Sequence, residues 1–180
     1  MIIEKKNGGC MERIAEFQKV SFEQFKEGYL KVKPSADDEK IRDSYSRIKL
    51  PERATEFSAG YDFYATYDFE LAPGETILIP TGIRAKIDAG WGLFLFPRSG
   101  LGFKYRLQLN NTVGVIDGDY YFSDNEGHIF AKITNDSKEE KKLSLSEGDA
   151  FIQGVFIPYG LTYNDNVETK RNGGFGSTDK

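Results

Sequence analysis

The stretch I-R-A-K-I-D-A-G-W-G-L-F-L-F, residues 83–96, decides the class of fold. Ile83, Ala85 and Ile87 alternate with two charged residues, which is the period of two typical of a strand with one buried face. The residues D-A-G then provide turn chemistry, and an apolar run of strand length follows them. The pattern therefore predicts two consecutive strands joined by a tight turn.

Further short apolar segments continue this pattern on both sides of the stretch. Residues 129–134 and 151–157 are predicted strands, and turn signals rich in Gly and Asp separate such segments along the chain. The chain contains 14 Phe, 10 Tyr and 19 Gly in 180 residues, which favours strands and tight turns over helices. An all-β sandwich or barrel over residues 51–170 is the predicted architecture.

The first 50 residues differ from this β region and form a predicted N-terminal extension. Ser21 followed by Gln24 matches a capping box at the start of a helix. Aromatic residues then recur at helical spacing: Phe22, Phe25 and Tyr29. We predict a short helix over about residues 22–30, with Ile14 and Phe17 on an earlier helical turn.

Two other segments are predicted to lack regular structure. Residues 31–46 are highly charged and include P-S-A-D-D, so they are expected to form a loop. Residues 171–180 are rich in Gly and hold a single aromatic residue, so we expect a mobile C-terminal arm.

Composition and charge exclude several classes of function. The net charge is −4 and no long block of Lys or Arg is present, so nucleic acid is not the expected partner. Cys10 is the only cysteine, which rules out an internal disulfide and fits a reducing compartment. Since the sequence has no apolar run of signal-peptide or membrane-span length, we expect a cytoplasmic protein that does not bind membranes.

Common catalytic motifs are also missing. The sequence has no G-x-x-x-x-G-K-[ST] loop, no H-E-x-x-H and no C-x-x-C pair. A Ser-His-Asp hydrolase would have to use His128, the only histidine, and Ser99 lacks the G-x-S-x-G context of such nucleophiles. A solvated or structural role for His128 is the simpler interpretation.

Five polar, Gly-rich segments interrupt the predicted strands where a plain sandwich would not need them. They are A-G-Y-D-F-Y-A (59–65), P-R-S-G-L-G (97–102), N-T-V-G-V-I-D-G-D-Y (111–120), G-D-A-F-I-Q (148–153) and R-N-G-G-F-G-S-T (171–178). In this order and spacing they resemble the five motifs of the trimeric dUTPases. The resemblance covers about residues 51–178. It implies a small jelly-roll-like β-sandwich or barrel of the dUTPase kind, a homotrimer with shared active sites, and hydrolysis of dUTP to dUMP and pyrophosphate.

The third motif carries the expected catalytic group. By resemblance, Asp117 orients and deprotonates the attacking water, a task that needs a base within hydrogen-bond reach. Tyr120 resembles the ring on which the deoxyribose packs, leaving no room for a 2′-hydroxyl. The strand from Asn111 to Asp117, which includes Val115 and Ile116, and a return strand near Phe130 resemble the hairpin that binds uracil.

The other motifs are expected to bind the phosphates. Arg98, Ser99 and Gly100 resemble a phosphate-binding turn, with Gln153 as a further contact. Asp62 resembles a carboxylate that holds waters around Mg²⁺, the implied cofactor, without direct ligation. The C-terminal arm is expected to close over the substrate, and its contact residues are Arg171, Phe175, Ser177 and Thr178.

The chain departs from the family pattern in three places. Ala150 stands where the fourth motif usually has Arg. The usual spacing to the fifth motif points to Lys170, whereas Arg171 has the better chemistry for bidentate phosphate binding. Residues 121–126 extend the segment after Tyr120 and are predicted to lengthen a hairpin tip.

Two other functions compete with dUTP hydrolysis. The related dCTP deaminases use a Glu on the strand after the hairpin, but Lys132 stands there in this chain and cannot act as an acid–base carboxylate. A binding or regulatory protein that keeps the nucleotide site as a sensor is the second alternative, with an unknown protein partner. The intact Asp117 favours retained catalysis.

Overall fold

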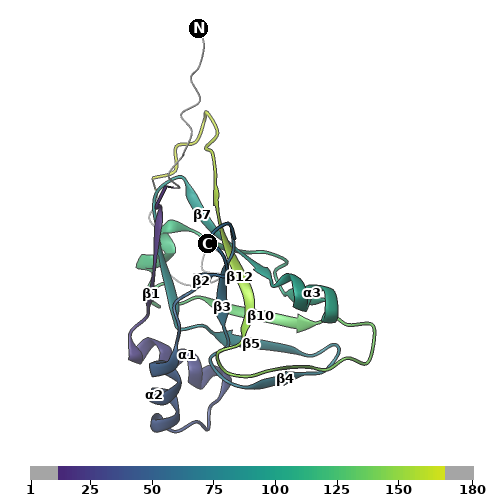
Figure 1. Ribbon diagram of the computed structural model, residues 1–180. Coiled ribbons are helices and arrows are strands. Elements are labelled where there is room, and N and C mark those ends of the chain that lie inside the picture. Colours follow the sequence, from purple (N-terminus) through teal and green to yellow (C-terminus); the bar gives the residue numbers. More distant parts are fainter. Residues whose placement is uncertain (1–11, 169–180) are drawn as a thin grey trace.

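The protein, for which we analysed a computed structural model, is described over residues 12–168 and consists mainly of antiparallel strands (Figure 1). The strands are β1 (Ala15–Lys19), β2 (Glu52–Arg53), β3 (Tyr61–Tyr64), β4 (Phe69–Leu71), β5 (Thr76–Pro80), β6 (Ile83–Ile87), β7 (Trp91–Pro97), β8 (Leu107–Leu109), β9 (Gly114–Ile116), β10 (Phe130–Asn135), β11 (Leu143–Leu145) and β12 (Ala150–Pro158). The helices are α1 (Phe22–Val32), α2 (Asp38–Arg47), α3 (Ser99–Tyr105) and the 3₁₀ turn η1 (Gly118–Phe122). Within the described part of the chain, no helix is both long and apolar enough to cross a membrane.

The strands form one five-stranded sheet and three smaller ones. The large sheet has the order β2-β3-β12-β7-β9, and a three-stranded sheet has the order β5-β10-β8. The pairs β1-β6 and β11-β4 complete the set. The predicted all-β sandwich is confirmed, and the strand pattern of residues 83–96 is found as β6 and the first six residues of β7.

The core includes side chains of the large sheet, in which β12 lies between β3 and β7. Phe63, Leu93 and Phe151 are among its fully buried side chains, each of which stabilises the fold by roughly 1.5–3 kcal/mol. Gly154 is needed in β12 because a Cβ there would lie 2.8 Å from Leu93 and 2.9 Å from Phe63. This close packing fixes the strand that carries Gln153 between its two neighbours.

The described part of the N-terminal extension contains a strand before α1, so the predicted helical turn around Ile14 and Phe17 is wrong. β1 pairs with β6 from Ala15↔Ile87 to Lys19↔Ile83. Phe17 packs against Tyr61 and Phe156, with ring centroids 5.3 and 5.6 Å apart. A segment of five residues can fit the period of a helix or that of a strand. Here pairing with β6 makes it a strand.

Helix α1 confirms the prediction for residues 22–30 and continues to Val32. The predicted loop at 31–46 is wrong over most of its length, because α2 occupies Asp38–Arg47. The side chain of Asp37 caps α2 by accepting a hydrogen bond from the amide of Lys40. Only Ile41 and Ser44 are buried, so the helix has too narrow an apolar stripe to be recognised from periodicity.

Both helices cover one side of the β region (Figure 1). Val20, Phe25, Tyr29 and Ile41 belong to the same buried cluster as the strand residues. The N-terminal segment is therefore part of the core packing and can influence the loops beside it.

Candidate active site

Three residues of the predicted phosphate site meet at one end of the large sheet. Asp62 in β3 stands opposite Gln153 in β12, and Gln153 stands opposite Phe96 in β7. Arg98 follows β7 directly, and its Nε lies 3.1 Å from Oδ1 of Asp62. The side-chain amide of Gln153 donates to the carbonyl of Pro97 at 3.2 Å. We call Asp62, Arg98 and Gln153 the Arg98 cluster.

The sequence around the Arg98 cluster leaves room for these side chains. A Cβ at Gly60 would lie 2.5 Å from Oε1 of Gln153, so a larger residue there would displace the end of that side chain. Ser99 and Gly100 are exposed in the first turn of α3, where backbone N–H groups lack intrahelical partners. A half-exposed guanidinium with nearby amides is suited to binding phosphate oxygens.

The backbone of Ala150 contacts the same arginine. Nη1 of Arg98 donates to the carbonyl oxygen of Ala150 at 3.4 Å. The backbone at this position thus helps to orient the guanidinium, although position 150 supplies no charge of its own.

Asp117 lies in a different part of the sheet. It follows β9, which pairs with β7 through Leu93↔Ile116 and Leu95↔Gly114, and it occupies the N-cap position of η1. Its side chain is exposed, and its carbonyl oxygen accepts a hydrogen bond from the amide of Tyr120. Asp117 is therefore exposed at the junction of β9 and η1.

Tyr120 is held firmly on the same turn. Its hydroxyl donates to the carbonyl of His128 and accepts from the amide of Asn125, both at 2.8 Å. The ring is only 3% exposed. Contact between this ring and a deoxyribose stays a prediction.

The two groups are far apart within one chain. Ile116 stands opposite Leu93. Arg98 is five positions further along the chain than Leu93, just past the end of β7, which corresponds to about 17 Å at roughly 3.3 Å per residue. Asp62 lies on β3, which β12 and β7 separate from β9. Figure 1 shows α3, directly after Arg98, on the right and the green helical turn after β9 on the left. One nucleotide cannot contact both groups of the same chain at its phosphates.

The predicted uracil hairpin is not formed by the strands that the sequence suggested. β9 pairs with β7, whereas β10 pairs with β5 and β8. The ring of Phe130 packs on His128 with centroids 4.2 Å apart. The strand that pairs with β10 is thus β8, which lies further from it in the sequence than β9 does.

The remaining residues of the predicted uracil segment differ in what they can offer. Asn111 is exposed, and Val115 is 48% exposed on β9. Ile116 is buried, so only its backbone could contact a ligand.

His128 has a structural role, which is one of the two roles that the sequence analysis favoured. The side chain is fully buried, and its Nε2 accepts a hydrogen bond from the amide of Gly82 at 2.9 Å. Burial, with a smaller contribution from Lys31, lowers the pKa of His128 to about 3. The imidazole is therefore neutral at physiological pH and enclosed, which excludes the Ser-His-Asp alternative.

Several predicted contacts cannot be placed. Lys170, Arg171, Phe175, Ser177 and Thr178 lie outside the described residues. Among residues 12–168, no group of three or more His, Cys, Asp or Glu side chains is arranged to hold a metal ion.

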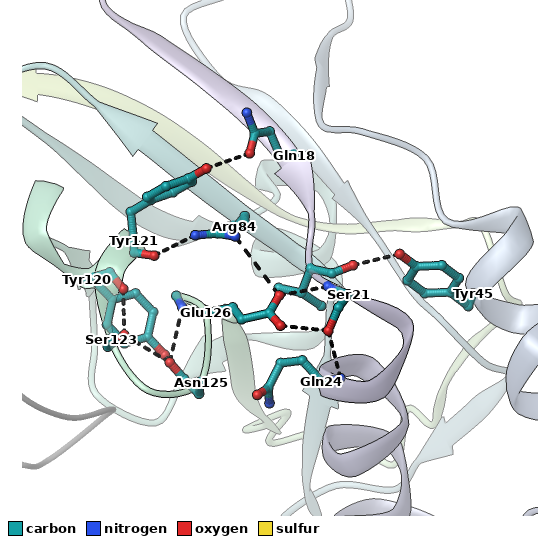
Figure 2. Close-up of polar contacts among 12 residues, drawn as sticks. Gln18, Ser21, Gln24, Tyr45, Arg84, Tyr120, Tyr121, Ser123, Asn125 and Glu126 are labelled. Carbon is teal, nitrogen blue, oxygen red and sulfur yellow. Dashed lines mark hydrogen bonds and ion pairs between the residues drawn. The ribbon is translucent and has the colours of Figure 1, made fainter.

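Sequence reasoning missed a polar network that joins the N-terminal extension to the turn after Asp117 (Figure 2). Its members are Gln18, Ser21, Arg84, Tyr121 and Glu126. The additional residues 121–126 could have drawn attention to this region. Their partners, about 100 positions earlier, could not have been found from the sequence.

Comparison with known proteins identifies the family. The family model of dUTPase matches residues 46–179. The deoxyuridine 5′-triphosphate nucleotidohydrolase of Lactococcus lactis is 46% identical over 134 residues, which cover 73% of this chain and 88% of that protein. The crystal structure of dUTPase from Streptococcus mutans superposes with a TM-score of 0.58 at 36% identity, covering 81% of this chain and 97% of that one. The chain belongs to the dUTPase family.

Proposed function

We propose that the protein hydrolyses dUTP to dUMP and pyrophosphate with the help of Mg²⁺, in a homotrimer whose active sites are shared between subunits. Family membership supports the reaction. The observation that carries the shared site is the separation of Asp117 from the Arg98 cluster along β7.

Asp117 is the proposed general base. It accepts a proton from a water aligned with the α-phosphorus, the new P–O bond forms, and the bond to the bridging oxygen of the β-phosphate breaks. The electron pair of that bond leaves with pyrophosphate. A base must lie within hydrogen-bond reach of its water, and the exposed carboxylate of Asp117 meets this requirement once a substrate is bound beside it.

The Arg98 cluster is the proposed binding site for the leaving phosphates. The guanidinium of Arg98 and the amides of Ser99 and Gly100 would neutralise charge that develops on the leaving group. Gln153 would donate a further hydrogen bond.

The chemistry of the donors fits a substrate-bound Mg²⁺. This ion commonly uses one or two carboxylates, several waters and the substrate's phosphates rather than a cage of protein ligands. Asp62, beside Arg98, would hold its waters. The ion would supply charge neutralisation at the phosphates.

Selectivity is proposed to come from the segment around Asp117. Backbone groups of Asn111, Val115 and Ile116 would form hydrogen bonds with the acceptor–donor–acceptor edge of uracil. Cytosine presents a different pattern and would leave some of these groups unpaired. Tyr120 would exclude the 2′-hydroxyl of ribonucleotides. Phe130 is a weaker candidate than the sequence suggested, because its ring is engaged with His128.

The shared site follows from the requirement that base and phosphate-binding groups act on one substrate. Since about 17 Å of strand separates them within a chain, Asp117 of one subunit must meet the Arg98 cluster of another. A closed symmetric oligomer repeats such a contact at every interface. The resemblance to trimeric dUTPases favours three subunits, with the C-terminal arm closing each site through Arg171, Phe175, Ser177 and Thr178.

The proposed reaction is tested by measuring pyrophosphate release from dUTP, dCTP, dTTP and UTP with and without Mg²⁺. We expect hydrolysis of dUTP to exceed that of each other nucleotide by orders of magnitude, and to fall sharply when the metal is chelated. Ammonia release from dCTP would favour the deaminase alternative. Tight dUTP binding without turnover would favour a sensor.

A further inference from the structure

The N-terminal segment is tied to the turn after Asp117 at two points (Figure 2). Both side-chain oxygens of Glu126 accept hydrogen bonds from Ser21, from its amide at 2.8 Å and its hydroxyl at 2.6 Å. The hydroxyl of Tyr121 donates to the side chain of Gln18 at 2.7 Å. Glu126 and Tyr121 belong to the insertion, whereas Ser21 and Gln18 precede residue 46, where the family model begins to match.

Arg84 of β6 fills the space between these two ties. Its guanidinium donates to the carbonyl of Tyr121 at 2.7 Å and lies 3.6 Å from the centroid of that ring. It also approaches the carboxylate of Glu126 at 4.0 Å. One cation therefore holds both ends of the insertion against β6, the strand to which β1 is paired.

The contact between Ser21 and Glu126 replaces the capping box that the sequence predicted. The hydroxyl of Ser21 accepts from the amide of Gln24 at 3.2 Å, as expected of an N-cap. The amide of Ser21, which the Gln24 side chain would satisfy in a capping box, is instead bound by Glu126. The first turn of α1 thus depends on the insertion, and the insertion depends on α1.

Glu126 has an unusual backbone conformation and a charge that strengthens its bonds to Ser21. Its φ of +56° is unusual for a residue with a side chain. Partial burial opposes ionisation, but the hydrogen bonds from Ser21 and the charge of Arg84 outweigh it and lower the pKa of Glu126. The carboxylate is therefore ionised at neutral pH, and hydrogen bonds to ionised groups are stronger than neutral ones.

The inner side of the insertion holds Tyr120. Asn125, adjacent to Glu126, donates to the Tyr120 hydroxyl, and the hydroxyl of Ser123 donates to the Tyr120 carbonyl at 2.5 Å. The amide of Tyr120 donates in turn to the carbonyl of Asp117. A continuous set of contacts runs from Ser21 through Glu126 and Asn125 to the proposed sugar-binding ring, and on to the backbone of Asp117.

We propose that Glu126, anchored by Ser21, is a positioning residue that sets the place of Tyr120 and Asp117, so that discrimination against ribonucleotides depends on the N-terminal extension. This inference deepens the proposed function and rests on it. We call the five residues that join the extension to the sugar end of the site the clamp; they are Gln18, Ser21, Arg84, Tyr121 and Glu126.

The test compares Glu126→Ala with Glu147→Ala in the full chain. Glu147 makes a matched tie to the extension elsewhere, since its carboxylate binds the guanidinium of Arg47 in α2 through two hydrogen bonds of 3.0 Å. For Glu126→Ala we expect kcat/KM for dUTP to fall about tenfold or more, and the ratio of dUTP to UTP efficiency to fall with it. Glu126→Gln, which keeps one acceptor oxygen, should recover part of that ratio.

Glu147→Ala should leave the ratio of dUTP to UTP efficiency unchanged, even if it lowers the melting temperature as much as Glu126→Ala does. The proposal would be overturned if the ratio were unchanged in Glu126→Ala. It would also be overturned if the ratio fell equally in the two variants. Hydrogen–deuterium exchange supplies a readout that needs no substrate: amides of residues 118–127 should exchange faster in Glu126→Ala but not in Glu147→Ala. If the unmodified protein failed to hydrolyse dUTP, the proposed function would be lost, and the exchange comparison would still decide whether the clamp holds the turn.

Discussion

Asp117→Asn is expected to lower kcat for dUTP by about 10²–10⁴-fold, the usual contribution of a positioned general base. Asparagine keeps the shape of the side chain but cannot accept the proton of the attacking water. Nucleotide affinity should change little, because in the proposed site other groups bind the base, sugar and phosphates. Steady-state pyrophosphate release and calorimetric titration with dUMP measure the two quantities separately.

The matched control is Asp119→Asn, two residues further along the same exposed turn. We expect it to keep turnover close to that of the unmodified protein. Near-normal turnover in Asp117→Asn, or equal losses in both variants, would remove Asp117 from the role of base.

Arg98→Ala is expected to lower kcat/KM for dUTP by about 10²-fold or more, because guanidinium–phosphate contacts are strong and directional. The change would also leave the Asp62 carboxylate without its ion pair, and a lone carboxylate repels the triphosphate. Arg98→Lys should restore only part of the activity, since Lys cannot bind phosphate bidentately.

Arg106→Ala is the control for the loss of an arginine–aspartate pair near the same helix. Arg106 lies 3.1 Å from Asp136 at the other end of α3, and both side chains are partly exposed, so the pair contributes little to stability. If Arg98→Ala reduced activity no more than Arg106→Ala, the Arg98 cluster would not be the phosphate site.

The sequence allowed the architecture to be predicted because its signals are local or repetitive, and the structure brings together three residues that the motifs singled out. Alternation in residues 83–87 is a direct consequence of one buried face, and β6 has those bounds. Asp62, Arg98 and Gln153 came from three motifs, and the register of β3, β12 and β7 places them together.

The errors fall where long-range contacts outweigh local preference. α2 has few apolar residues, and it is stabilised by capping at Asp37 and by contacts such as that of Ser44 with the carbonyl of Thr66. The pairing of β10 with β8, which is further away in the sequence than β9, is a long-range contact of this kind. The bond between Ser21 and Glu126 spans 105 positions, and no local pattern encodes such a contact.

The most direct test of a shared active site is to mix the two inactive variants, Asp117→Asn and Arg98→Ala, under conditions that allow subunits to exchange. Each variant supplies the group that the other lacks. If every site takes Asp117 from one subunit and Arg98 from another, an equal random mixture should recover about a quarter of the unmodified activity. Mass spectrometry would verify that mixed oligomers form. If their activity were no greater than the sum of the two separate variants, each site would be built within one chain, which would contradict the proposed shared site.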